Sequence, residues 1–199
     1  RRGRVLIALM QWYARVFYSK YNVQNVYGDT DSVFVAISNI SSLDEAAEIG
    51  VRMAADITAE MKRRYTTDSP EHNILTLAFE KVFLVLLLIA KKRYAGLKYE
   101  YSQETKKLEA KPAEGVPTMS GLESKRRDVT LLVSQYIGDV LALLLQPDKT
   151  TAENLQIARG YVWEHMVRPV LNNTINPRML VITKQLRMLP EQYAAKGQA

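Results

Sequence analysis

The sequence contains no cysteine and only two histidines among its 199 residues, which excludes several kinds of site. Without cysteine the chain cannot form a disulfide, bind a metal through thiolates or use a thiol nucleophile. His72 lies in a polar stretch and His165 in a helical pattern, so we do not expect a histidine-based metal site. The absence of cysteine is also consistent with a reducing compartment.

Long apolar runs are absent as well. The longest spans residues 82–90, which is too short for a membrane-spanning helix and is better interpreted as a buried strand. We therefore expect no membrane partner. The chain starts at Arg1 rather than at a methionine, and its last residues, 193–199, resemble an element that is cut off before its end. We therefore expect the chain to be a fragment of a longer protein.

The residues that are present indicate a globular protein with a basic surface. The chain is 47% hydrophobic and 24% charged, which is typical of a folded domain with a substantial core. Its net charge is +6, with a pI near 9.4, and this favours a polyanionic partner.

The hydrophobic pattern predicts an α+β fold. The first part alternates helix and strand, and a loop or domain junction rich in polar residues follows at 102–120. The second part is mainly helical. The expected helices are 4–20, 42–65, 129–146 and one from Thr150 that closes before Pro169; the expected strands are 23–27, 33–37 and a strand-like stretch at 74–101 that the cluster at 91–93 and Gly96 interrupt.

The sequence Tyr27-Gly28-Asp29-Thr30-Asp31-Ser32 lies between the first two expected strands and predicts a hairpin. Asp29 and Asp31 are two residues apart, and Mg²⁺ binds through one or two carboxylates together with substrate phosphates. Two such ions would stabilise the attacking and leaving oxygens of an in-line displacement. The alternative is an ordinary turn, because aspartate favours turns by bonding to its own backbone.

Other metal-dependent interpretations of this motif can be compared. An EF-hand starting at Asp29 fails, because Phe34 and Ile40 stand where that loop needs glycine and glutamate. In a haloacid-dehalogenase-like phosphatase Asp29 would be the nucleophile and Asp31 the acid/base, but Gly28 interrupts the strand and an apolar strand follows directly. A glycosyltransferase Asp-x-Asp motif is too short to be excluded.

Two basic clusters follow, at Lys91-Lys92-Arg93-Tyr94 and Lys125-Arg126-Arg127. Cations beside an aromatic ring fit phosphate contacts on a nucleic acid, and the alternative is a solvated basic face. We expect the second cluster to open the helix after the loop, where cations are unfavourable to the helix dipole unless an anion compensates them. Glu80 precedes the apolar run and either joins the acidic site, pairs with Lys81 or points to solvent.

In this order the motifs resemble B-family DNA polymerases, most closely those of the eukaryotic δ type and of large DNA viruses. Tyr27–Ser32 matches the palm motif C of that family. The segments 79–82 and 91–96 resemble its Lys-Lys-x-Tyr strand, 121–128 resembles its Gly-Leu-Glu-x-x-Arg-Arg-Asp segment, and 180–184 resembles a thumb segment.

The resemblance implies an antiparallel palm subdomain with a metal-binding hairpin over 1–124 and a partial, mainly helical thumb over 125–199. The implied activity is template-directed addition of dNTPs to a primer 3′ end with two Mg²⁺ ions. Asp31 would be the principal metal ligand, Asp29 would support it directly or indirectly, and Glu80 would lie near the centre. The residues implied to contact primer–template DNA are Lys91, Lys92, Arg93, Tyr94, Lys125, Arg126 and Arg127.

The chain also departs from the family pattern. Ser120 stands where the family usually has lysine before Gly-Leu-Glu, so the resemblance does not imply a DNA contact at this position. The family's motif A aspartate and its nucleotide-binding helix would lie before Arg1, so we expect the chain alone to be inactive. A non-catalytic DNA-binding module of the same fold is the alternative. A processivity factor would be a partner of the full protein, and the resemblance suggests a location in the nucleus or in a virus-infected cell.

Overall fold

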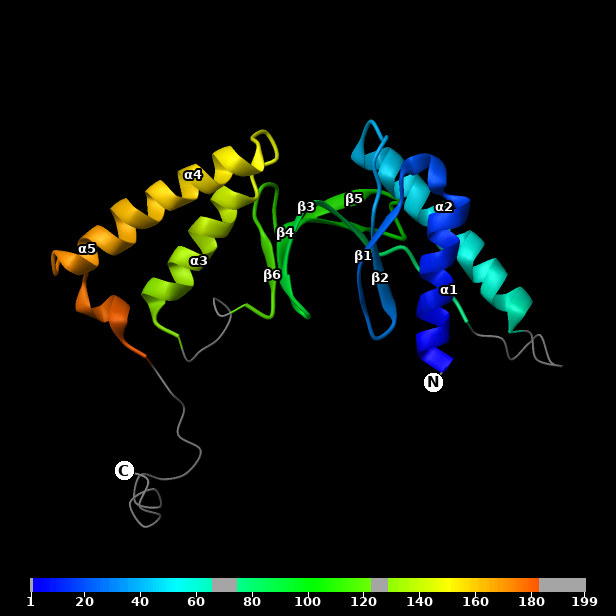
Figure 1. Ribbon diagram of the computed structural model, residues 1–199, viewed down its shortest axis with the longest axis horizontal. Helices are drawn as coiled ribbons and strands as arrows, with labels where there is room; N and C mark the ends of the chain where they lie inside the picture. The colour runs from blue at the N-terminus through cyan, green and yellow to red at the C-terminus, as the bar shows by residue number, and fades with distance from the viewer. Residues whose placement is uncertain (1, 66–74, 123–128, 183–199) are drawn as a thin grey trace, which may run out of the picture.

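The computed structural model describes residues 2–65, 75–122 and 129–182. Antiparallel strands occupy the middle of the molecule, with helices at either end (Figure 1). The elements in chain order are α1 (Arg2–Phe17), a 3₁₀ turn (Ser19–Tyr21), β1 (Gln24–Asp29), β2 (Ser32–Ala36), α2 (Leu43–Arg64), β3 (Lys81–Ala90), β4 (Arg93–Tyr101), β5 (Leu108–Lys111), β6 (Thr118–Ser120), α3 (Leu131–Leu144), α4 (Thr151–Val162), a π-helical turn (Trp163–Val167), α5 (Arg168–Leu171) and a 3₁₀ turn (Pro177–Leu180).

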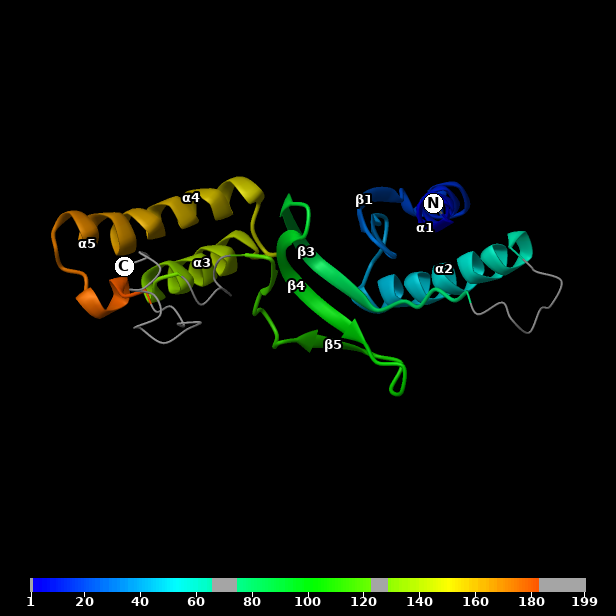
Figure 2. The same ribbon diagram turned by 90° about the horizontal axis from the view of Figure 1, so that it is seen from below.

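The strands form two separate antiparallel sheets. Strands β1 and β2 make a hairpin of their own, while β3, β4 and β5 lie side by side and β6 pairs with the other part of β4. Seen from below in Figure 2, α1 and α2 lie on one side of the larger sheet, and α3 and α4 extend from the opposite side. The predicted α+β class is confirmed.

The first apolar core joins α1, α2 and the β1–β2 hairpin. Helix α2 contributes Met53, Ile57 and Met61, whose spacing of four places them on one face, and all three are buried. Leu9, Met10 and Ala14 of α1 pack against this face. The hydroxyl of Tyr18 donates a hydrogen bond of 2.5 Å to Asp56, which satisfies a polar pair at the edge of the core.

The second core joins the larger sheet to α3. Ala95 and Leu97 of β4 are buried together with Leu122, Leu141 and Leu145. This cluster draws residues from both sides of the predicted subdomain boundary at 124/125, so the start of the helical part is packed on the sheet. None of the helices in the described ranges is long and apolar enough to cross a membrane.

Helix ends follow the expected capping chemistry with one difference. Thr150 and Glu153 form the predicted capping box, in which each side chain bonds the backbone of the other. At α2 the Ser42 hydroxyl accepts from the Glu45 N–H, but the Glu45 carboxylate accepts from Ser41 instead of Ser42. Only half of that predicted box therefore forms at Ser42.

Several predictions about element boundaries were wrong. The expected loop at 102–120 contains β5 and β6, because β4 offers backbone partners along both halves of its free edge. Gly96 does not interrupt the strand but lies inside β4. Helix α3 begins at Leu131 rather than at 129, because Thr130 caps it: the Thr130 hydroxyl accepts a hydrogen bond from the Val133 N–H.

The helix starting at Thr151 also continues past Pro169 instead of ending before it. A π-helical turn at 163–167 lets the Arg168 N–H bond to the carbonyl of Trp163, five residues earlier. Proline has no N–H to offer the carbonyl four residues before it, which here belongs to His165. The hydroxyl of Tyr136 in α3 donates to that carbonyl instead, so the neighbouring helix satisfies it.

Candidate functional site

The predicted acidic hairpin is present, with Asp29 paired to Ser32 and only Thr30 and Asp31 between the strands. The turn is tight: the Asp31 N–H lies 2.6 Å from the carbonyl oxygen of Asp29. It also forces Thr30 to a φ of +55°, which is uncommon for a β-branched residue. Strained backbone of this kind persists where the surrounding structure imposes it, and it occurs often at functional sites.

The two carboxylates of the turn have different surroundings. The side chain of Asp29 is 22% exposed, and both of its oxygens have partners. Oδ1 accepts from the Thr30 hydroxyl at 3.2 Å, and Oδ2 lies 3.3 Å from the ammonium of Lys92. Asp31 is exposed, and within the described ranges its carboxylate has no hydrogen-bond or ion-pair partner. Asp31 is therefore the more accessible ligand for a cation.

A second tight turn, Lys91–Lys92 between β3 and β4, lies against the first. The backbone N–H of Lys92 donates a 2.9 Å hydrogen bond to the hydroxyl of Tyr27. On its other side Gly121 approaches so closely that a β-carbon there would overlap the Lys92 carbonyl oxygen. Gly121 has a φ of +62°, which glycine adopts at no steric cost. The turn is thus held from both sides.

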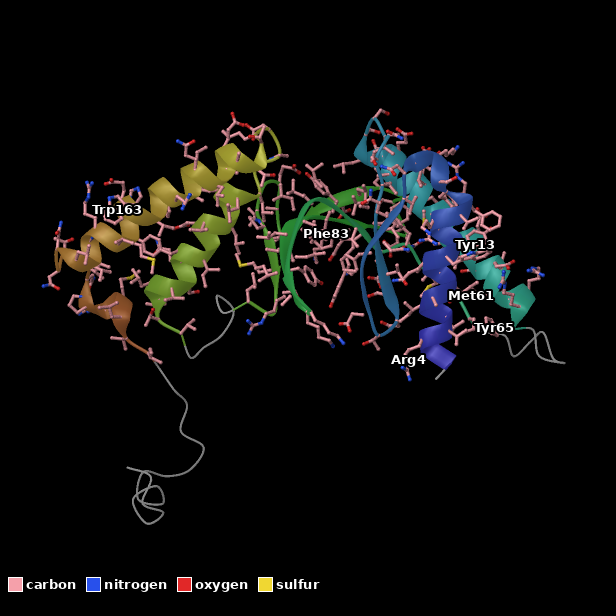
Figure 3. All side chains as sticks on the ribbon, viewed as in Figure 1. Arg4, Tyr13, Met61, Tyr65, Phe83 and Trp163 are labelled. Atoms are coloured by element: carbon pink, nitrogen blue, oxygen red, sulfur yellow. The ribbon has the colours of Figure 1, made fainter. Side chains whose placement is uncertain are left out.

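Four aromatic rings pack where the two sheets meet. The ring of Phe34 lies 5.4 Å from Tyr27 and 5.7 Å from Tyr94, measured between centroids. Phe83 of β3 lies 5.9 Å from Phe34 and is labelled in Figure 3 between the larger sheet and the β1–β2 hairpin. Aromatic pairs at these distances contribute about 0.5–1.5 kcal/mol each beyond the area they bury. The cluster fixes the acidic turn relative to the basic one.

The structure places Glu80 apart from these turns. It precedes β3, whereas the Lys91–Lys92 turn follows β3, so the length of the strand separates them. Its side chain is 71% exposed and lies 3.3 Å from Lys81, the pairing that the sequence left open as an alternative. In the same part of the sheet a hydrogen bond from Lys98 lowers the pKa of Glu100.

The basic residues are only partly described. Lys91, Lys92 and Arg93 are exposed at the turn, and Tyr94 is half-buried in the aromatic cluster. Lys125, Arg126 and Arg127 lie outside the described residues, and the described α3 starts after them, at Leu131. The sequence did not indicate that Lys92 pairs with Asp29 or that Gly121 supports the same turn, since 63 and 29 positions separate these residues. The order of the motifs along the chain was the only feature of the sequence that pointed to a common site for these residues.

The turn has the chemistry for a hard cation but does not complete a site by itself. Mg²⁺ accepts one or two carboxylates, with water and phosphate oxygens filling the other positions. Asp31 and Asp29 can provide these carboxylates. Within 2–65, 75–122 and 129–182, no group of three or more acidic or histidine side chains is placed to hold a metal ion. An ion bound at this turn would need further ligands from a substrate or from another segment.

Comparison with known proteins gives one consistent family. Residues 4–199 match the model described as DNA polymerase family B. The DNA polymerase delta catalytic subunit of Plasmodium falciparum is 33% identical over 189 residues, which cover 92% of this chain and 15% of that protein. The subunit of the same name from Caenorhabditis elegans is 34% identical over 172 residues, 86% of this chain and 13% of that protein. The chain thus spans about a seventh of the length of these relatives.

Proposed function

Because this chain belongs to DNA polymerase family B, we propose that it is the C-terminal part of the palm and the start of the thumb of an enzyme that extends a primer 3′ end with dNTPs. The observation that carries the proposal is the contact between the acidic turn at Asp29–Asp31 and the basic turn at Lys91–Lys92. Ligands for a cation and contacts for a phosphate backbone lie side by side. This family assignment favours a polymerase over a phosphatase or a glycosyltransferase.

In this proposal the exposed carboxylate of Asp31 is the principal ligand of the chain for Mg²⁺, and Asp29 supports it. Two bound Mg²⁺ ions would stabilise the attacking and leaving oxygens of nucleotidyl transfer. Tyr27, Gly28, Thr30 and Ser32 set the geometry of the turn; Ser32 donates a 3.2 Å hydrogen bond to the Asp29 carbonyl. In this proposal Glu80, which precedes β3 and pairs with Lys81, is not an essential ligand of the cation.

The basic residues would hold the primer–template duplex. Lys91, Lys92 and Arg93 are exposed beside the acidic turn, where they can neutralise phosphates just behind the point of insertion. We assign the same role to Lys125, Arg126 and Arg127 from the family motif alone. Residues 1–124 would then belong to the palm and 125–199 to the thumb. A processivity factor, and a location in the nucleus or an infected cell, are proposed for the parent protein on the family resemblance.

We further propose that the parent supplies the missing carboxylate from a segment outside this chain, so that the chain alone does not extend primers. The relatives are about seven times longer than the matched segment, which leaves ample sequence for it. Primer extension by the isolated chain would contradict this part of the proposal. It would leave the polymerase assignment itself intact.

The decisive test uses the complete protein with Asp31→Asn. We expect nucleotide incorporation to be abolished while primer–template binding persists, because the change removes a cation ligand and leaves the basic turn in place. Asp44→Asn, at an exposed position in the first turn of α2, is the matched control and should retain activity. Unchanged incorporation in Asp31→Asn would favour the alternative, a DNA-binding module that has kept the fold without the chemistry.

A further inference from the structure

Lys92 is the residue at which the two turns are joined, and its backbone and side chain have separate partners. Its N–H is bound by the Tyr27 hydroxyl and its carbonyl lies against Gly121, so the backbone is fixed. Its side chain is 65% exposed and reaches the Asp29 carboxylate at 3.3 Å. The ammonium can therefore change partner by rotating side-chain bonds, without any movement of the turn.

The Asp29 carboxylate cannot hold Lys92 and a divalent cation equally well. An ammonium next to a doubly charged ion is repelled, and both compete for the same oxygen. We propose that Lys92 neutralises Asp29 until a divalent cation replaces it, and that the released ammonium then binds a DNA phosphate. This inference rests on the proposed function, because it takes the acidic turn as the cation site and the basic turn as the DNA site.

The exchange makes cation binding and DNA binding cooperative. A cation that displaces Lys92 makes this ammonium available to DNA, and DNA that draws Lys92 away makes the Asp29 carboxylate available to the cation. By linkage, each ligand must increase the affinity of the other by the same factor. An ion pair with one well-exposed partner, such as Lys92, is worth about 1 kcal/mol or less, so we expect a factor of about two to five.

The first test measures Mn²⁺ binding to the complete protein by electron paramagnetic resonance, comparing Lys92→Met with Lys91→Met. Both variants lose one exposed cation from the same turn, but only Lys92 contacts Asp29. Lys92→Met should bind Mn²⁺ about two- to fivefold more tightly than the unchanged protein. Lys91→Met should change the affinity less than twofold, because salt screens a charge that has no contact with the site. Equal effects of the two variants would overturn the proposal.

The second test measures primer–template binding by fluorescence anisotropy, with and without Mn²⁺ at matched ionic strength. The affinity for primer–template with Mn²⁺, divided by the affinity without it, should be about two- to fivefold higher for the unchanged protein than for Lys92→Met. Lys91→Met should give the same ratio as the unchanged protein. An identical ratio in all three proteins would overturn the proposal. Circular dichroism and thermal unfolding establish that the variants are folded.

Failure of this inference differs from failure of the proposed function. If Asp31→Asn abolishes Mn²⁺ binding but Lys92→Met and Lys91→Met are equivalent, the acidic turn is a cation site and the exchange is wrong. If Mn²⁺ binding does not depend on Asp31, both are wrong. Asp29→Asn adds a further check: it should weaken Mn²⁺ binding, and an increase would mean that Asp29 only positions Lys92.

Discussion

The hydroxyl of Tyr27 accepts a 2.9 Å hydrogen bond from the backbone N–H of Lys92, 65 positions later in the sequence. The bond connects the β1–β2 hairpin to the turn between β3 and β4, which belong to different sheets. Through it, a residue of the acidic motif determines where the basic motif lies. This dependence can be measured.

Tyr27→Phe should destabilise the chain by about 0.5–1.5 kcal/mol, because it removes the acceptor of this hydrogen bond while keeping the aromatic ring. Urea unfolding monitored by circular dichroism measures the effect. Tyr94→Phe is the control, since in the described part of the chain the Tyr94 hydroxyl has no hydrogen-bond partner. Equal losses in the two variants would mean that the bond to Lys92 contributes nothing.

Gly121→Ala should be considerably more destabilising than Gly115→Ala. Both glycines have positive φ, +62° and +69°, so each alanine carries a backbone cost of about 1–2 kcal/mol. At Gly121 the new methyl would also overlap the Lys92 carbonyl, whereas no atom lies within 4 Å at Gly115. We expect about 1–3 kcal/mol of additional loss in urea unfolding. Equal losses would show that the turn can shift away without cost.

Lys92→Ala should weaken primer–template binding and reduce the slope of log affinity against log salt by about one. The reason is that one fewer phosphate is neutralised and one fewer counterion is released. Anisotropy titrations over a range of salt concentrations measure the slope. Lys149→Ala, in the connection between α3 and α4, is the control and should leave the slope unchanged. An unchanged slope in Lys92→Ala would remove Lys92 from the DNA interface.

Asn154→Ala should destabilise the helical part by about 1–3 kcal/mol. Asn154 is 3% exposed, and its amide donates to the carbonyls of Leu144 and Gln146 at the C-terminal end of α3. Alanine would leave these acceptors without that donor. Gln156→Ala, at an exposed position of the same helix, should change stability by less than about 0.5 kcal/mol. Similar values for the two variants in urea unfolding would contradict this role.

Stability at alkaline pH should depend on Tyr161. Its hydroxyl donates a 2.6 Å hydrogen bond to Asp139, which raises the pKa of Tyr161 to about 12 from an unperturbed value near 10. The folded state therefore favours the protonated phenol. Its contribution is fully present below about pH 10 and is lost as the pH rises to about 12.

We expect the difference in unfolding free energy between the unchanged chain and Tyr161→Phe to shrink across this window. Other groups titrate in both proteins and cancel from the difference. A difference that stays constant from about pH 10 to 12 would mean that the hydrogen bond to Asp139 does not hold the proton.

Local features of the fold could be predicted from the sequence because they depend on neighbouring residues. The burial of Met53, Ile57 and Met61 follows from their spacing, and the capping box follows from Thr150 and Glu153. The acidic hairpin follows from turn-forming residues between two β-rich segments. In each case the interacting groups are within a few positions of one another.

Features that depend on distant residues could not be predicted. Strands β5 and β6 are polar and short, and only the free edge of β4 explains why they pair. Likewise, the different surroundings of Asp29 and Asp31 depend in part on the contact between Asp29 and Lys92, 63 positions later in the sequence. The sequence also left open whether Glu80 joins the acidic site or pairs with Lys81, because the pairing depends on where β3 begins.

The π-helical turn at 163–167 limits which insertions and deletions the helix spanning residues 151–171 can accept. Removing one of its residues would restore regular α-helical winding, but the ring of Pro169 would then be forced against a carbonyl one turn earlier. Replacing the proline alone would leave a widened turn that no longer relieves a clash with the proline ring. The extra residue and Pro169 are therefore a matched pair, and we expect related chains to gain or lose both together.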